Sequence, residues 1–206
     1  MMQYCFSFLL LALFFSSAYG EKPGIPECDT ALCDRLAEKA DWLEVPALDG
    51  IVNKHELFSI SLPRSPTHLV TTDSLFAAKY KSDKLISISE ITREHYSYLA
   101  NSEFTLLDWA DIVFHQTRKS KIPNKPDERK IWRETLFIKQ MIFDAKSVTY
   151  AKHDGFTLYL MSGKQSGPYE NVVYLLMDEK PNSFFQIEFA NFSVTEICAM
   201  LNSIRR

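Results

Sequence analysis

Charged residues are absent from the first 20 positions of this 206-residue chain, and long apolar runs are absent from the rest. The second absence excludes a membrane-spanning helix after residue 20, because a span needs about 20 predominantly apolar residues. Metal-binding motifs are also missing: the five histidines form no His-Glu-x-x-His pair and lack the cysteine partners of a zinc site. The net charge of −3 provides no general attraction to nucleic acid or to an anionic membrane.

The uncharged opening has the organisation of a secretory signal peptide. An apolar core at residues 6–15 is followed by small residues, with Ala18 and Gly20 placed where a signal peptidase requires small side chains. The core is also too short to cross a bilayer comfortably. We therefore predict cleavage after Gly20 and a secreted or periplasmic protein. An uncleaved N-terminal anchor is the alternative, because the first four residues contain no lysine or arginine.

Three cysteines follow the signal, and an odd number in an exported chain suggests one disulfide and one free thiol. Cys28 and Cys33 are the expected pair, because Asp29 or Thr30 would cap a short helix and let Cys28 fold back on it. A redox pair is the alternative, but redox motifs separate their cysteines by two residues and here there are four. Cys198 falls on the apolar side of the last expected helix, which predicts a buried thiol.

The remaining chain is long enough for one domain with a real core. Its hydrophobic periodicity predicts an extended leader with a short helix at residues 21–53 and an α+β globular domain at residues 54–206. Expected helices lie at residues 30–40, 105–119, 127–145 and 193–204. Expected strands lie at residues 56–62, 69–71, 75–80, 85–89, 147–152, 156–161, 172–177 and 184–189. The last four strands are joined by short turns, which predicts an antiparallel meander packed by helices.

Two stretches carry a family resemblance. Residues 57–63 are Leu-Phe-Ser-Ile-Ser-Leu-Pro, and residues 185–193 are Phe-Gln-Ile-Glu-Phe-Ala-Asn-Phe-Ser, followed by a capped helix. With the order of elements over residues 54–204, they resemble the Mog1/PsbP-like α/β sandwich. The resemblance rests on hydrophobic spacing and capping residues, so it implies a fold and no site residue. Such proteins are typically non-catalytic binding or assembly factors, and some small exported bacterial proteins of this build are immunity proteins, which implies a binding role by analogy.

One side of the expected helix at residues 105–119 carries Asp108, Asp111 and His115. Spacings of three and four residues place these side chains on one helical face, where they could bind a divalent cation. They are the candidates for a metal-dependent enzyme or a small hydrolase with a site assembled only in the fold. The opposite face is apolar, so a solvated surface is the simpler explanation. We therefore predict neither a metal nor another cofactor.

The segment from Arg118 to Arg133 is the one local charge imbalance, with seven basic residues against three acidic ones nearby. It could bind an acidic protein surface or another anion, or it could be an ordinary solvated loop and helix start. A nucleic-acid site would need several interleaved aromatic residues, and only Trp132 is present. The candidate binding residues are Lys119, Lys121, Lys125, Arg129, Lys130 and Arg133.

No set of residues in the sequence converges on a known catalytic motif. The leading hypothesis is therefore a non-enzymatic exported protein that binds another protein, as an accessory or neutralising factor of the cell envelope. An enzyme assembled in three dimensions and a small-ligand carrier using an aromatic sheet face are the alternatives. The sequence makes no prediction about the oligomeric state.

Overall fold

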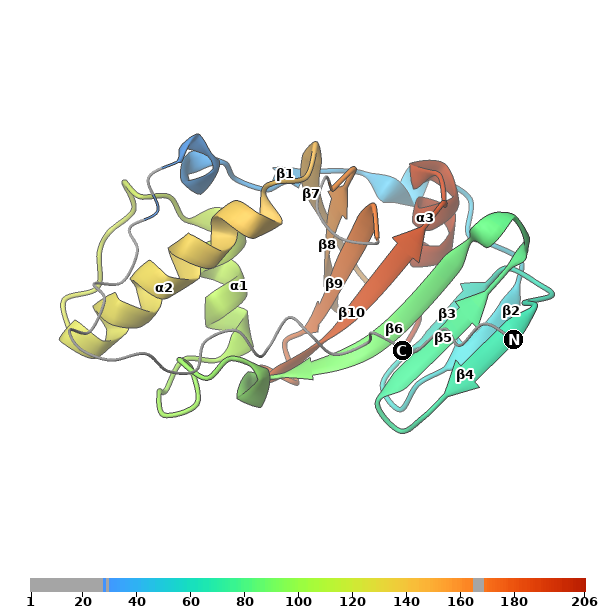
Figure 1. Cartoon of the computed structure of the whole chain (residues 1–206), viewed down its shortest axis with the longest axis horizontal. Coiled ribbons are helices and arrows are strands. Elements are labelled where there is room, and N and C mark those ends of the chain that lie inside the picture. Colours follow the sequence, from blue (N-terminus) through green and yellow to red (C-terminus); the bar gives the residue numbers. More distant parts are fainter. Residues whose placement is uncertain (1–27, 29, 165–168) are drawn as a thin grey trace, which may run out of the picture.

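The computed structural model describes residue 28, residues 30–164 and residues 169–206. An eight-stranded sheet forms its centre (Figure 1). Two long helices cover one face of this sheet, and a two-stranded sheet and a short helix cover the other. The predicted α+β sandwich with a mainly antiparallel sheet is confirmed. The predicted signal peptide, residues 1–20, lies outside the described residues.

The strands of the large sheet are ordered β1-β7-β8-β9-β10-β6-β5-β4, and β1 alone pairs in parallel with its neighbour among the described strands. Their bounds are β1 Glu38–Lys39, β4 His68–Thr71, β5 Leu75–Lys79, β6 Leu85–Thr92, β7 Ser147–His153, β8 Phe156–Ser162, β9 Asn171–Met177 and β10 Ser183–Ala190. Strands β7 to β10 form the antiparallel meander that the sequence predicts. Strands β2 (Ile51–Lys54) and β3 (Ser59–Leu62) form the separate two-stranded sheet.

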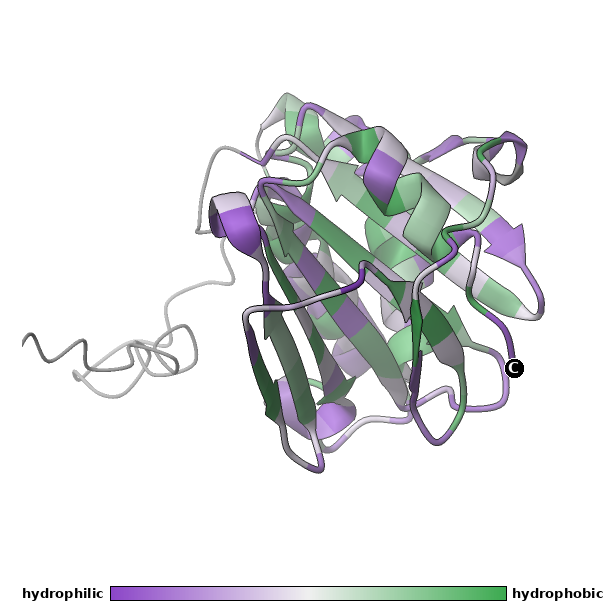
Figure 2. Cartoon of the chain, turned by 90° about the vertical axis from the view of Figure 1, so that its right-hand side faces the viewer, coloured by the Kyte–Doolittle hydropathy of each residue, from purple (hydrophilic) through white to green (hydrophobic). Residues whose placement is uncertain are grey.

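Alternation along the strands produces two cores, one on each face of the large sheet. Figure 2 shows this alternation as bands of hydrophobic and hydrophilic colour along the strands. On β10, Phe185, Ile187 and Phe189 are buried against β3 and helix α3 (Val194–Leu201), as predicted. The opposite face packs against α1 (Leu106–His115) and α2 (Pro126–Ile142). Among the described residues, no helix is both long and apolar enough to cross a membrane.

Capping boxes start two of the helices at the residues that the sequence predicts. At α1, the Asp108 backbone N–H donates to Thr105 Oγ1 (3.1 Å), and the Thr105 N–H donates to the Asp108 carboxylate (2.8 Å). Ser193 and Glu196 make the equivalent pair at α3, with distances of 3.3 and 2.9 Å. Each box satisfies backbone donors that a helix start leaves unpaired, so both α1 and α3 begin at defined positions.

The start of α2 differs from the prediction. Asp127 is the N-cap that the sequence predicts, but the helix begins at Pro126 and Lys125 occupies the cap position without a side-chain hydrogen bond. Proline suits the first helical position, because its fixed φ is helical and its missing N–H would have no partner there. Asp127 consequently lies within the first turn, where its charge favours the positive end of the helix dipole.

The predicted helix at residues 30–40 is wrong. A single 3₁₀ turn, η1 (Ala31–Asp34), is followed by extended chain that pairs with the edge of the large sheet as β1. The Ala37 N–H donates to Phe114 O and the Ala40 N–H to Tyr150 O, both at 2.9 Å, so hydrogen bonds from distant elements override the local helical spacing. The sequence prediction also missed β2, which pairs with β3 where a loop was expected.

The predicted disulfide is confirmed. Cys28 and Cys33 are bonded, with their Cα atoms 6.1 Å apart, and Thr30 occupies the N-cap position of the 3₁₀ turn between them. The bond closes a loop of only a few residues, so it restrains the N-terminal end without organising the rest of the fold. Cys198 is a free and buried thiol, as predicted, and burial raises its pKa.

Candidate functional site

The structure does not gather Asp108, Asp111 and His115 into a metal site. The Asp108 carboxylate is used in the capping box of α1, and Asp111 accepts a hydrogen bond from the Gln116 side chain (2.8 Å). His115 pairs through Nε2 with the Tyr159 hydroxyl at 2.9 Å. Within the described part of the chain, no three His, Cys, Asp or Glu side chains are grouped closely enough to hold a metal ion.

Burial shifts the pKa values of both His115 and Tyr159 in the direction that favours their neutral forms. It lowers the pKa of His115, although the nearby Asp111 carboxylate opposes this effect. It also raises the pKa of the Tyr159 hydroxyl. Both groups are therefore neutral at physiological pH, and their hydrogen bond joins α1 to β8.

Three of the six predicted binding residues make contacts within their own segment. Lys125 forms an ion pair with Glu128 (2.8 Å), which raises the pKa of the lysine, and Lys130 lies 4.0 Å from the Glu134 carboxylate. Arg129 donates to two backbone carbonyls of the preceding loop, at 3.2 Å each. The Arg129 bonds join the start of α2 to the preceding loop, while the Lys130–Glu134 pair lies within the helix. The three side chains therefore offer less free charge than the sequence suggests.

The other three predicted residues, Lys119, Lys121 and Arg133, are exposed. They lie at or next to a hollow of about 230 Å³ on one side of α2. Its lining combines apolar and basic side chains: Cys28, Arg118, Ile122, Trp132, Arg133 and Leu136. Arg133 lines this hollow directly, and Lys119 and Lys121 adjoin two of its lining residues in the chain. We call this region, together with the two lysines, the basic hollow.

Two further contacts make the basic hollow a defined surface. The Trp132 indole N–H donates to the Gln116 side chain (2.9 Å), which holds the ring in place while burying its apolar body. Arg118 forms an ion pair with Asp34 of η1 at 2.5 Å, and the arginine holds the pKa of that carboxyl below its usual value. Ile122 remains 46% exposed beside these fixed residues. The hollow is thus lined by the buried Trp132, the exposed Ile122 and the basic Arg118 and Arg133.

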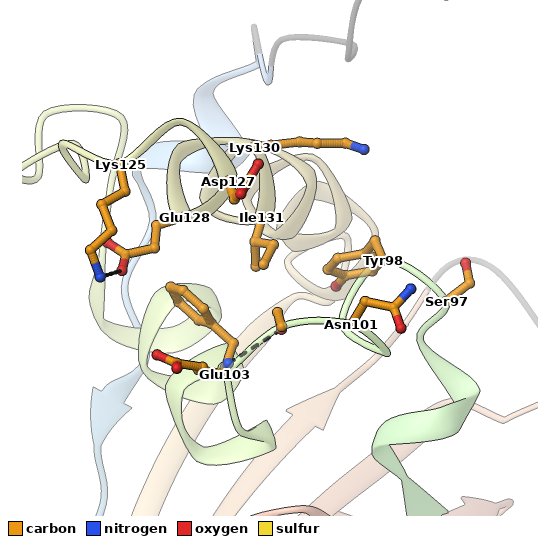
Figure 3. Close-up of a pocket in the computed structure, with 11 residues that line it drawn as sticks. Ser97, Tyr98, Asn101, Glu103, Lys125, Asp127, Glu128, Lys130 and Ile131 are labelled. Carbon is orange, nitrogen blue, oxygen red and sulfur yellow. Dashed lines mark hydrogen bonds and ion pairs between the residues drawn. The ribbon is translucent and has the colours of Figure 1, made fainter.

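A second hollow, of about 450 Å³, lies on the other side of α2 (Figure 3). Tyr98, Phe104 and Ile131 supply its apolar surface, and charged side chains surround them. The charged residues are Glu103, Lys125, Asp127, Glu128 and Lys130. We call it the Tyr98 cleft. Its lining includes three carboxylates and two lysines, so its charge is mixed, whereas both charged residues that line the basic hollow are arginines.

The segment at residues 97–104 forms one wall of the Tyr98 cleft and is held by its own hydrogen bonds. Ser102 Oγ donates to Leu99 O (2.8 Å) and accepts from the Phe104 N–H (3.2 Å), and Leu99 is fully buried. The Tyr98 hydroxyl accepts from the Trp109 indole N–H at 2.8 Å. Burial raises the pKa of Tyr98 to about 12. The tyrosine is therefore a neutral hydrogen-bonding group and not a base at physiological pH.

Helix geometry explains why the two hollows are separate. Successive residues are rotated by about 100° around a helix axis, so Ile131 and Leu136 leave α2 in directions about 140° apart. The sequence prediction named the basic segment as a whole, and its residues divide between the two hollows: Arg133 lines the basic hollow, and Lys125 and Lys130 line the Tyr98 cleft. It missed the Tyr98 cleft, because residues 97–104 carry no motif and their position depends on contacts with α1. No local sequence signal could have located that wall.

Comparisons with family models, with curated proteins and with solved structures each found no match. The Mog1/PsbP-like resemblance therefore remains a prediction from the sequence. Function has to be argued from the chemistry of the surfaces themselves.

Proposed function

We propose that this chain is a non-enzymatic exported protein that binds an acidic protein through the basic hollow. One observation carries the proposal: the exposed Ile122 and the buried Trp132 line the hollow together with the basic Arg118 and Arg133. In the chain, the exposed Lys119 directly follows Arg118 and the exposed Lys121 directly precedes Ile122. Apolar anchors seated in a pocket supply most of the affinity of protein interfaces, and complementary charge supplies orientation and association rate. The matching partner presents an apolar side chain surrounded by carboxylates.

Two further features support export and a binding role. Cys28 and Cys33 form a disulfide. Disulfides persist in oxidising compartments and are rare in the cytosol, which agrees with the predicted signal peptide. The Mog1/PsbP-like resemblance implies a binding or assembly factor. An accessory or neutralising role in the cell envelope is the most concrete form of the proposal.

The test uses the full-length protein with a C-terminal tag, captured from its native host and analysed by quantitative mass spectrometry. We expect a bait processed to begin at Glu21 and one stoichiometric partner with an acidic surface. The triple variant Lys119→Glu, Lys121→Glu, Arg133→Glu should lose this partner, because each change replaces attraction by repulsion. Raising the salt concentration should weaken capture by the unaltered protein for the same reason.

A matched control reverses three exposed lysines on other elements. Lys54, Lys81 and Lys152 lie at the end of β2, after β5 and in β7, and all are exposed. Their replacement by glutamate changes the net charge by the same amount and should leave capture intact. If both triple variants retain the partner, the basic hollow is not the contact surface. A processed bait that repeatedly comes down alone would contradict the binding function itself.

A further inference from the structure

The two edges of the large sheet are protected to very different degrees. The β1 edge consists of only two residues, Glu38 and Lys39, and both are charged. Short and charged edge strands are the usual protection against pairing with another chain. The β4 edge has four residues, His68–Thr71, without a lysine, an acid or a proline, and all four are exposed. Leu69 and Val70 are 58% and 48% exposed.

The hydrogen-bonding pattern shows which backbone groups β4 leaves free. At the turn between β4 and β5, the Thr72 N–H donates to Leu75 O (2.8 Å) and the Leu75 N–H donates to Thr72 Oγ1 (3.1 Å), so the Thr72 N–H points inward, toward β5. Antiparallel ladders alternate, so the registered pair Val70–Ala77 is also hydrogen-bonded inward. At the other end of β4, the Thr67 N–H also points inward and donates to Lys79 O (2.7 Å). The backbone N–H and C=O groups of Leu69 and Thr71 consequently point out of the sheet. No strand of the described chain pairs with them.

The apolar side chains beside this edge also lack cover. Leu69 is paired with Ala78 and therefore shares the face on which Phe76 and Ala78 enter the core. Across the sandwich, Ile51 of β2 is paired with the buried Leu62 and is still 50% exposed. The ends of β2 and β4 line one hollow of about 260 Å³, so the two strands approach each other at this end of the molecule. The sandwich is thus open where β2 and β4 form its edges, at the right of Figure 1.

We propose that two copies of this chain pair through their β4 edges, antiparallel and around a twofold axis at Val70. In this register the backbone N–H and C=O of Leu69 exchange hydrogen bonds with the C=O and N–H of Thr71 in the second copy. The twofold axis repeats this exchange for Thr71, so the outward backbone groups of both residues are paired. The two Val70 side chains face each other in the non-hydrogen-bonded position, where side chains approach most closely. The pairing joins two eight-stranded sheets into one.

Two features favour a second copy of this chain as the partner of the β4 edge: the charges that would face each other, and an assembly that is complete at two copies. In the proposed register His68 faces Thr72 and Thr67 faces Asp73, so no like charges are opposed along the strand. The contact uses the open edge of both copies at once. The remaining edge on each side is the charged β1, so the assembly stops at two and does not extend into a fibre. The dimer does not depend on the binding function proposed for the basic hollow, which lies at α2.

The first test measures the mass of the purified processed protein by sedimentation equilibrium over a wide range of concentration. We expect a reversible dimer. The variant Val70→Lys places two ammonium groups opposite each other at the axis and should weaken association on the order of tenfold or more. Val194→Lys is the matched control, because Val194 is 46% exposed on α3 and lies outside the proposed contact. It should leave the dimer unchanged.

The second test examines the register with a single new cysteine. Facing residues at a non-hydrogen-bonded position have Cα atoms about 4.5 Å apart, within disulfide range, so Val70→Cys should form a covalent dimer under mild oxidation. Cys28 and Cys33 are already bonded and Cys198 is buried, so the new thiol is the reactive one. Val194→Cys should remain monomeric on denaturing gels.

Each of the other outcomes contradicts part of the proposal. A protein that stays monomeric at every concentration overturns it, and would leave the β4 edge to a strand of a different protein. A dimer that Val70→Lys does not weaken lies elsewhere on the molecule. A dimer that Val70→Lys weakens but Val70→Cys cannot cross-link overturns the register.

Discussion

The two faces of the large sheet bury different kinds of side chain. The face under β3 and α3 is filled mainly by phenylalanine and aliphatic residues, with Trp42 and Tyr80 also among the buried residues. The Phe58 ring contacts those of Phe156 and Phe185, and the Phe189 ring contacts that of Phe192. The helical face also contains buried tryptophan and tyrosine side chains with polar partners: the Trp109 indole donates to the Tyr98 hydroxyl, and the Tyr159 hydroxyl is hydrogen-bonded to His115. A fully buried lysine, Lys139, also lies on the helical side.

This difference suggests separate roles for the two faces. The face under β3 and α3 contributes mainly to stability, and the face under α1 and α2 lies beside both hollows. The first face is held mainly by close apolar packing. Tyrosine and tryptophan pack through their apolar rings while their O–H and N–H groups form hydrogen bonds, so such residues can line hollows at the surface on the helical side. Both hollows beside α2 are lined by such a residue, Trp132 in one and Tyr98 in the other.

The largest effect should come from creating a cavity in the core under β3 and α3. Leu158 on β8 is 1% exposed, and Leu158→Ala should lower the free energy of unfolding by about 2–5 kcal/mol, because its neighbours cannot fully fill the space. Leu36 is 48% exposed, and Leu36→Ala should stay within about 0.5 kcal/mol of the unaltered protein. Urea unfolding followed by circular dichroism measures both. Equal losses in the two variants would contradict the view of this face as a packed core.

The next effect should come from Lys139 on the helical side. Its ammonium group donates to Gln116 O and lies 4.8 Å from the centre of the Phe143 ring, and burial lowers the pKa of the lysine to about 8. Between about pH 8 and pH 10.5 the unfolded chain therefore holds a proton that the folded chain has lost. Stability conferred by this group must rise with pH across that window, by an amount on the order of 3 kcal/mol.

The variant Lys139→Met isolates this contribution, because it keeps an unbranched side chain and removes the titration. The difference in the free energy of unfolding, unaltered protein minus Lys139→Met, should grow as the pH rises from about 8 to about 10. Other titrating groups contribute equally to both proteins and cancel. The exposed Lys130 on the same helix supplies the control, and Lys130→Met is measured in parallel. A difference that stays constant or falls with pH would show that Lys139 is not desolvated.

The sequence predicted the elements whose signals are local. The alternation of Phe185, Ile187 and Phe189 identified β10 and its buried face, and Thr105 and Ser193 identified the starts of α1 and α3. These features need only the period of a strand or the donors of a first turn. The prediction failed at β1 and β2, because their backbone partners lie on β7 and β3 and a short segment cannot show which distant strand will accept it.

The candidate site was predictable to a similar limit. Composition located the basic segment, and helical spacings of three and four residues are signals that could have paired Lys125 with Glu128 and Lys130 with Glu134. The apolar floor at Trp132 could not have been placed, because it depends on where the chain returns after α1. The Tyr98 cleft needs two segments that only the tertiary fold brings together.

The smallest effect we expect compares one histidine on each face. His55 lies between β2 and β3, its ring is stacked on Phe58 with centroids 4.6 Å apart, and its Nε2 atom is buried without a hydrogen-bond partner in the described structure. Burial lowers the pKa of His55. Below about pH 6.5 the unfolded chain therefore binds a proton more readily than the folded chain, and stability must fall as the pH falls.

His55→Phe preserves an aromatic ring on Phe58 and removes the titration, so the unaltered protein should lose stability relative to this variant between about pH 7.5 and about pH 5.5. His115 should behave in the same direction but more weakly, because Asp111 stabilises its charged form and partly offsets the effect of burial on its pKa. His115→Phe is therefore the comparison variant, measured by thermal unfolding across the same pH range. A larger pH dependence at His115 than at His55 would contradict this prediction, because it would mean that burial lowers the pKa of the histidine more on the helical face.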